Sequence, residues 1–148
     1  MAQRKQGVSE ELDVLSSTLV GDALDLLADG EDVNVLLVVQ DAKGAIASYE
    51  FADDGPEATL NAARDRVLDL AKAHGDVEAS LADPVRYALV YEGMIADETD
   101  AYQDALMLEF GEKGWNAYSA FSLYEGKGAG EGFMWTDPAP AGEIEPLL

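Results

Sequence analysis

Cysteine is absent from this chain of 148 residues, and histidine occurs only once. Without cysteine there can be no disulfide, no thiolate nucleophile and no cysteine-ligated zinc. The nine lysine and arginine residues provide few cations for holding phosphate or carboxylate substrates. A serine nucleophile would also find few basic side chains to activate it. These shortages argue against the familiar kinds of enzyme catalysis.

Long apolar runs are also missing. No stretch approaches the roughly 20 apolar residues that a membrane-spanning helix needs. The basic segment Met1–Gly7 is followed by acidic residues rather than by an apolar run, so we do not expect a secretory signal. We therefore expect a cytoplasmic protein that does not bind membranes.

Negative charge is the most unusual property of the sequence. Thirty aspartate and glutamate residues against nine basic residues give a formal net charge of −21. Such a field repels nucleic acid and anionic membranes, so neither is an expected partner. The acidic residues are scattered rather than grouped in blocks. This distribution favours solubility or adaptation to high salt over binding to a basic protein or mimicry of nucleic acid.

The length and composition are typical of one globular domain. Hydrophobic residues make up 48% of the chain, which is more than disordered proteins contain. We predict a single domain at 9–136, preceded by a flexible arm at 1–8 and followed by a tail at 137–148. The tail holds three of the five prolines, so we expect no regular structure there. It either hangs free or lies over an apolar groove, with these residues as anchors: Ile144, Leu147 and Leu148.

Two segments have the apolar spacing of three and four residues that is typical of an amphipathic helix. The first covers about 10–28, and Ser9 is suited to cap its start. The second covers about 56–74, where Pro56 fits the first turn. The only histidine, His74, falls in the last turn, where a cation interacts favourably with the helix dipole. We therefore assign His74 a structural role and not a catalytic one.

Most of the remaining chain has strand-like patterns. Residues 33–40 are almost continuously apolar, as expected for a central strand that is buried on both faces. A turn at 41–44 leads into a second strand. Later segments alternate apolar and polar residues, and a glycine-flanked turn at 111–114 joins the last two. The predicted strands are 33–40, 45–51, 85–91, 105–110 and 115–124, with 133–136 as a short addition.

These elements predict a single-domain α+β fold in the order helix-strand-strand-helix-strand-strand-strand. An antiparallel sheet of five to six strands is covered on one or both faces by the two amphipathic helices. The predicted core contains the large apolar residues of the helix stripes and strand faces. They are Leu15, Leu19, Leu26, Val35, Leu37, Val39, Leu60, Val67, Leu70, Tyr87, Leu89, Leu106, Leu108, Phe110 and Phe121.

Three sequence features suggest chemistry but are better explained without it. The glycines between Gly126 and Gly132 alternate with other residues and no helix pattern follows, so they predict a linker and not a dinucleotide loop. The acidic loop at 97–100 lacks the spacing of a calcium loop. Glu92 and Glu109 lie near the ends of strands that could be neighbours, yet among 30 acidic residues such pairs arise by chance. Only a cleft and a raised pKa would make this pair a candidate site. We assign no catalytic, cofactor-binding or metal-binding residue.

Part of the second half of the chain resembles a known sequence pattern. Within 86–114, the stretches RYALVYEG and DALMLEFGEKG resemble a pattern in small bacterial proteins. That family has no established activity, so the resemblance implies no site. The order of the predicted elements also resembles roadblock and profilin-like sandwiches. This second resemblance implies a binding or scaffolding module, by analogy of element order alone.

The sequence leaves three hypotheses for function, and none of them calls for a cofactor. The first is a non-enzymatic protein-interaction or accessory module that self-associates through a sheet edge or an aromatic strand face, because aromatic residues are available while catalytic groups are scarce. The second is a small-ligand-binding protein or an enzyme that uses Tyr and Asp/Glu groups in a pocket. The third is an acidic antagonist that occupies a basic surface of another protein.

Overall fold

A seven-stranded sheet organises the chain in the computed structural model, which describes residues 4–52, 55–96 and 98–148. In chain order the elements are α1 (Glu10–Ala28), β1 (Val35–Asp41), β2 (Ile46–Phe51), α2 (Pro56–Ala73), β3 (Pro84–Ala96), β4 (Tyr102–Glu112), β5 (Ala117–Glu125), a 3₁₀ turn at Gly130–Gly132, β6 (Met134–Trp135) and β7 (Ala139–Ile144). The sheet order is β2-β1-β3-β4-β5, and β6 and β7 both pair with β5 at the far edge. All of these strand pairs are antiparallel. The predicted α+β class is therefore confirmed.

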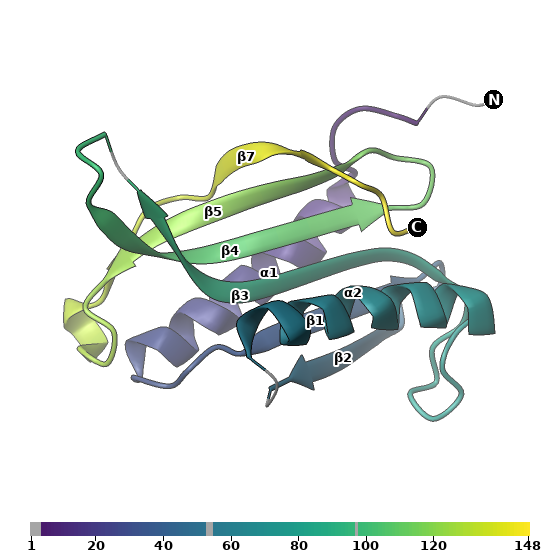
Figure 1. The fold of residues 1–148 in the computed structure, drawn as a ribbon. Helices are drawn as coiled ribbons and strands as arrows, with labels where there is room; N and C mark the ends of the chain where they lie inside the picture. The colour runs from purple at the N-terminus through teal and green to yellow at the C-terminus, as the bar shows by residue number, and fades with distance from the viewer. Residues whose placement is uncertain (1–3, 53–54, 97) are drawn as a thin grey trace.

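The two helices cover opposite faces of the sheet (Figure 1). Successive side chains of a strand point to opposite faces. In β3, Ala88 and Val90 therefore pack with α1, whereas Tyr87 and Leu89 pack with α2. The same alternation in β1 explains its nearly continuous apolar sequence, since both of its faces are covered.

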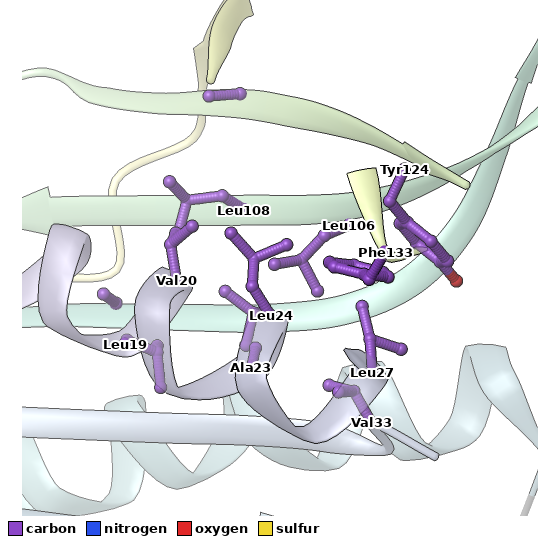
Figure 2. Packing of buried hydrophobic residues seen from close by; sticks show 13 residues of the cluster. Leu19, Val20, Ala23, Leu24, Leu27, Val33, Leu106, Leu108, Tyr124 and Phe133 are labelled. Atoms are coloured by element: carbon purple, nitrogen blue, oxygen red, sulfur yellow. The ribbon is translucent and has the colours of Figure 1, made fainter. Parts of the chain in front are cut away.

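Helix α1 forms the larger apolar cluster with β3, β4 and β5. Figure 2 shows Val20 and Leu24 of α1 pointing toward Leu106 and Leu108 of β4. Burying each large apolar side chain contributes roughly 1.5–3 kcal/mol. The Ser9 hydroxyl accepts a hydrogen bond from the Leu12 backbone N–H at 3.1 Å, which confirms the predicted helix cap.

Helix α2 covers β2, β1 and β3 on the other face. Its buried residues Ala63, Val67 and Leu70 pack against Leu37 and Val39 of β1. His74 ends this helix in the left-handed conformation, with a φ of 56°. Its backbone N–H caps the helix by donating to a carbonyl of the last turn.

The predicted core is buried except at four positions. Leu26, Leu60, Phe110 and Phe121 are half-buried. Leu26 and Phe110 pack at the margin of the α1 cluster, and Leu60 packs at the margin of the α2 cluster. Phe121 faces the α2 side of β5, whereas α2 itself packs on β1, β2 and β3. Helix coverage, which periodicity alone does not reveal, accounts for these differences.

The C-terminal segment contradicts our expectation that prolines exclude regular structure there. Residues Ala139–Ile144 form β7, which lies beside β5 in Figure 1. An edge strand tolerates Pro140 because one side of the strand needs no backbone donor. Farther on, Leu147 and Leu148 pack against the α2 cluster. The tail therefore docks on the domain through two of the three predicted anchors, while Ile144 lies half-buried within β7.

The predicted N-terminal arm also contacts the sheet. The Lys5 backbone N–H donates to the Gly114 carbonyl, and the Asn116 N–H donates to the Lys5 carbonyl, each at 2.9 Å. Residues 1–3 of the predicted arm lie outside the described residues. The described part of the arm is therefore joined to the turn between β4 and β5.

The hairpin of β3 and β4 is longer than predicted. Its pairing runs from Arg86 opposite Glu112 to Ala96 opposite Tyr102. On the other side of β4, the pairing with β5 stops at Ala105. The end of the hairpin therefore extends past its neighbour as a two-stranded ribbon.

A candidate binding groove beside helix α1

An apolar groove lies between α1 and the sheet edge formed by β5, β6 and β7. Its floor contains Leu108 and Phe110 of β4 together with Ala120 of β5. The groove has a volume of about 740 Å³, which falls within the range of about 300–1,000 Å³ that is usual for ligand pockets. It is therefore large enough to accept several apolar side chains.

One wall of the groove is the side of α1. This wall contains Ser16, Ser17, Val20, Gly21 and Leu24. Three of these residues are small, and a Cβ atom added to Gly21 would meet no other atom within 4 Å. The groove consequently has open space directly beside the helix backbone.

The opposite wall is formed by the segment that leads from β6 into β7. It contains Trp135, Pro138 and Pro140. Trp135 is 56% exposed, and its ring stacks on Phe133 with the ring centroids 5.9 Å apart. Phe133 in turn contacts the buried Tyr124 ring at 5.8 Å. An exposed aromatic surface is thus attached to the core through two ring contacts.

A second aromatic pair lies where the N-terminal arm closes the groove. The rings of Phe110 and Tyr118 are 6.0 Å apart. The Gly7 backbone N–H donates to the Tyr118 hydroxyl at 2.8 Å, and Val8 lines the groove beside it. The arm therefore positions Tyr118 and also forms the end of the groove.

The charged side chains identified on the α1 side and the β7 side of the groove are acidic. Among the described residues that line it, Asp13 is the only charged one. Helix α1 contains five acidic residues and no lysine, arginine or histidine. In β7, Glu143 pairs with Tyr118 of β5 and is exposed. Since paired residues point to the same face, Glu143 lies on the groove side of the sheet. The groove is thus apolar inside and acidic at its margins.

The carboxylate pair considered from the sequence is not brought together. Glu92 lies on the α1 side, where it accepts hydrogen bonds from the Tyr124 hydroxyl at 2.9 Å and the Val33 N–H at 2.9 Å. Lys127 Nζ lies 3.1 Å from the same carboxylate. Burial and the bond to Glu92 raise the pKa of Tyr124. These contacts make Glu92 a structural carboxylate.

Glu109 lies on the opposite side of the sheet, beneath α2. Arg64 donates from Nε to one Glu109 oxygen at 3.0 Å and from Nη2 to the other. This contact raises the pKa of Arg64. Tyr87 and Tyr91 lie near the pair, and burial raises the pKa of both phenols. Because Arg64 occupies both carboxylate oxygens, Glu109 acts as an ion-pair partner and not as a free acid or base.

The other features noted in the sequence have structural roles where they are described. In the glycine-rich segment, the Gly128 N–H donates to the Leu27 carbonyl at 2.9 Å, so the segment packs on the end of α1. His74 Nδ1 lies 3.4 Å from an Asp83 oxygen, and its side chain is largely exposed. Residue 97 of the acidic loop lies outside the described residues. Within 4–52, 55–96 and 98–148, no group of three or more His, Cys, Asp or Glu residues is placed to hold a metal ion, and no helix is long and apolar enough to cross a membrane.

Sequence reasoning did not identify the groove. Its only local signals were the small residues Ser17 and Gly21, four positions apart, and the aromatic Trp135 beside a proline-rich segment. Neither signal indicates which elements lie next to each other. Pairing of β6 and β7 with β5 brings Trp135 and Pro140 opposite α1 and creates the groove.

Comparison with family models, curated proteins and solved structures finds no match to this chain. The resemblance to small bacterial proteins and the resemblance to roadblock and profilin-like sandwiches therefore stay predictions. The groove itself is the feature from which a function can be proposed.

Proposed function

We propose that this protein is a non-enzymatic interaction module that holds an apolar segment of a partner protein in the groove beside α1. The observation that carries the proposal is the open apolar surface between Gly21 and Trp135. Exposed aromatic side chains with apolar surroundings are typical of protein interfaces. Trp135 is the strongest candidate for such an interface residue, because it is exposed and held from behind by Phe133.

The charge of the molecule favours a partner different from itself. A net charge of −21 makes two copies repel each other, because like charges oppose association. A basic partner would instead be attracted by the acidic margins of the groove. We therefore favour a heterologous partner over the self-association considered from the sequence.

A groove-filling variant tests this function. Gly21→Leu places a side chain in the groove without replacing a core residue, and Gly21→Ala is the matched control because its methyl group fills little space. Peptides selected from a random display library on the wild-type protein should bind the Gly21→Ala variant and fail to bind the Gly21→Leu variant. Binding can be followed by the emission of Trp135 in a Trp115→Phe background.

The same experiment separates the remaining hypotheses. Peptides that bind both Gly21 variants equally and dissociate at moderate salt would support the acidic-antagonist hypothesis and contradict a role for the groove. Small apolar compounds that bind in place of peptides, with the same sensitivity to Gly21→Leu, would support the small-ligand hypothesis.

A further inference from the structure

We infer that the occupant of the groove is an amphipathic helix of the partner, with lysine or arginine on its outer side. This inference rests on the proposed function and specifies the class of partner. It follows from the width of the sheet surface that forms the floor of the groove, from the hydrogen bonding of the β5 backbone and from the acidic residues at the margins of the groove.

The vacant surface is about one helix wide. A helix with side chains is about 10–12 Å across and strands lie about 4.7–4.9 Å apart, so one helix covers about two strands. On this face α1 packs on β3 and β4. Toward the edge the next strand is β5, which β7 flanks. The floor of the groove is formed by β4 and β5, between α1 and the wall at Pro138 and Pro140, and is thus about two strands wide. The surface therefore has room for one more helix alongside α1.

The backbone around the groove favours a helix over an extended segment. Along Tyr118–Phe121, β5 is paired with β4 on one side and with β7 on the other. Its N–H and C=O groups are therefore used within the sheet. An extended peptide lying on this face would leave its own backbone groups without partners as they became buried. A helix satisfies those groups internally.

The α1 wall permits close approach of a second helix. Ser17 and Gly21 are four positions apart and so lie on one side of α1. Packed helices have axes about 8–10 Å apart, and small side chains at the contact allow the shorter distances. Apolar side chains of the incoming helix at spacings of three and four would lie between Gly21 and the Trp135 ring.

The margins of the groove specify the charge of the occupant. Asp13 lies on the α1 side, and Glu143 lies on the β7 side. A helix between these margins would have both flanks beside carboxylates. Lysine or arginine at the flanks would be attracted, whereas glutamate or aspartate would be repelled.

A designed peptide series tests the inference with the full-length protein. The parent peptide has leucine at helical spacing and lysine elsewhere. The first comparison peptide has a central proline, the second has glutamate in place of every lysine, and the third has the parent composition scrambled to remove the apolar stripe. Affinity is measured by Trp135 emission in a Trp115→Phe background, and peptide helicity is measured by isotope-edited NMR.

The parent peptide should bind and become helical. The proline peptide should bind about a hundredfold more weakly, because proline breaks the helix. At low ionic strength, the affinity of the glutamate peptide should be lower than that of the parent by roughly tenfold or more. Gly21→Leu should abolish binding of the parent, and Gly21→Ala should retain it. Sensitivity to Gly21→Leu distinguishes occupation of the groove from general attraction of lysine to an acidic protein.

Specific results would overturn the inference. If the proline or scrambled peptide binds as tightly as the parent and remains sensitive to Gly21→Leu, the groove holds a non-helical segment, and only the proposed function survives. Equal affinity for the glutamate and lysine peptides would remove the requirement for a basic helix. If Gly21→Leu changes the binding of no peptide, from this series or from the display library, both the inference and the proposed function fail.

Discussion

Arg64 of α2 holds the buried carboxylate of Glu109 on β4 through two hydrogen bonds. The Glu109 side chain is 7% exposed, whereas the Arg64 side chain is 36% exposed. The pair joins α2 to a strand outside the three that its apolar residues cover. A polar contact at the margin of the helix therefore helps to determine how α2 lies on the sheet.

The first prediction concerns this ion pair. Arg64→Met should lower the free energy of unfolding by about 2–3 kcal/mol, because it leaves a buried carboxylate without its partner. The expected loss in the free energy of unfolding is small for a buried ion pair, because Arg64 is partly exposed to solvent. Urea unfolding followed by circular dichroism measures the change. Adding Glu109→Leu to Arg64→Met should restore part of the loss, and a double variant less stable than Arg64→Met would contradict this explanation.

The second prediction concerns the hydroxyl of Tyr87. This group is buried and has no hydrogen-bond partner in the part of the chain that the structure describes. Tyr87→Phe should therefore leave the free energy of unfolding unchanged or raise it by up to about 1 kcal/mol, because burying an unpaired hydroxyl is unfavourable.

Tyr124→Phe is the matched control for Tyr87→Phe, because Tyr124 is also a buried residue but its hydroxyl donates to Glu92 at 2.9 Å. Loss of a hydrogen bond to a charged group should cost about 1.5–3 kcal/mol. The two variants differ only in which phenolic oxygen is removed. A Tyr87→Phe variant less stable than Tyr124→Phe would show that Tyr87 has a partner in solution.

The third prediction concerns acid unfolding. The Asp41 side chain accepts hydrogen bonds from the backbone N–H groups of Ala82, Ala45 and Lys43. The bond from Ala82 is the largest cause of a lowered pKa for Asp41. A folded-state pKa below the unfolded value of about 3.9 stabilises the protein above that pH. This stabilisation is lost as the pH falls through the folded-state pKa.

Asp41→Asn tests that linkage. The variant should melt several degrees below the wild type at neutral pH. The difference should shrink as the pH falls below about 4, because Asp41 takes up a proton first in the unfolded chain and then, at its lowered pKa, in the folded protein. Calorimetric melting at a series of pH values measures the difference. A constant difference across the series would mean that the ionised form of Asp41 gives no specific stability.

The fourth prediction concerns the stability of the groove variants. Gly21 lies in the interior of α1, and an added Cβ meets no atom within 4 Å. Gly21→Ala should therefore raise the free energy of unfolding by about 0.5–1 kcal/mol, because alanine favours helix more than glycine does. Gly21→Leu should also remain folded. A loss of stability in Gly21→Ala, measured by urea unfolding, would mean that the surroundings of Gly21 are closed in solution.

Local patterns were sufficient to predict much of the fold. The leucine spacing of α1 and the cap at Ser9 define where that helix begins, because helix formation depends on neighbouring residues. Alternation in β3 separates Tyr87 and Leu89 from Ala88 and Val90. The same patterns did not show that β3 continues to Ala96, where no covering helix enforces an apolar face.

The pairing and register of strands that are distant in the sequence could not be predicted in the same way. The strands that contain Glu92 and Glu109 are neighbours, as the sequence allowed, but the register of β3 against β4 puts the two residues on opposite faces. The proline-rich segment looked irregular, although the open edge of β5 provides hydrogen-bonding groups that make it a strand. The faces of the two glutamates and the formation of β7 both depend on how a strand pairs with the backbone N–H and C=O groups of a distant segment.

Periodicity, capping and charge thus specified two amphipathic helices, an antiparallel sheet and a strongly acidic surface, since these properties are encoded by residues close together along the chain. Only the tertiary structure decided that the helices lie on opposite faces and that Trp135 and Gly21 border one groove. The groove exists because α1 is too narrow to cover all the strands on its face, and that mismatch arises only after the sheet has assembled.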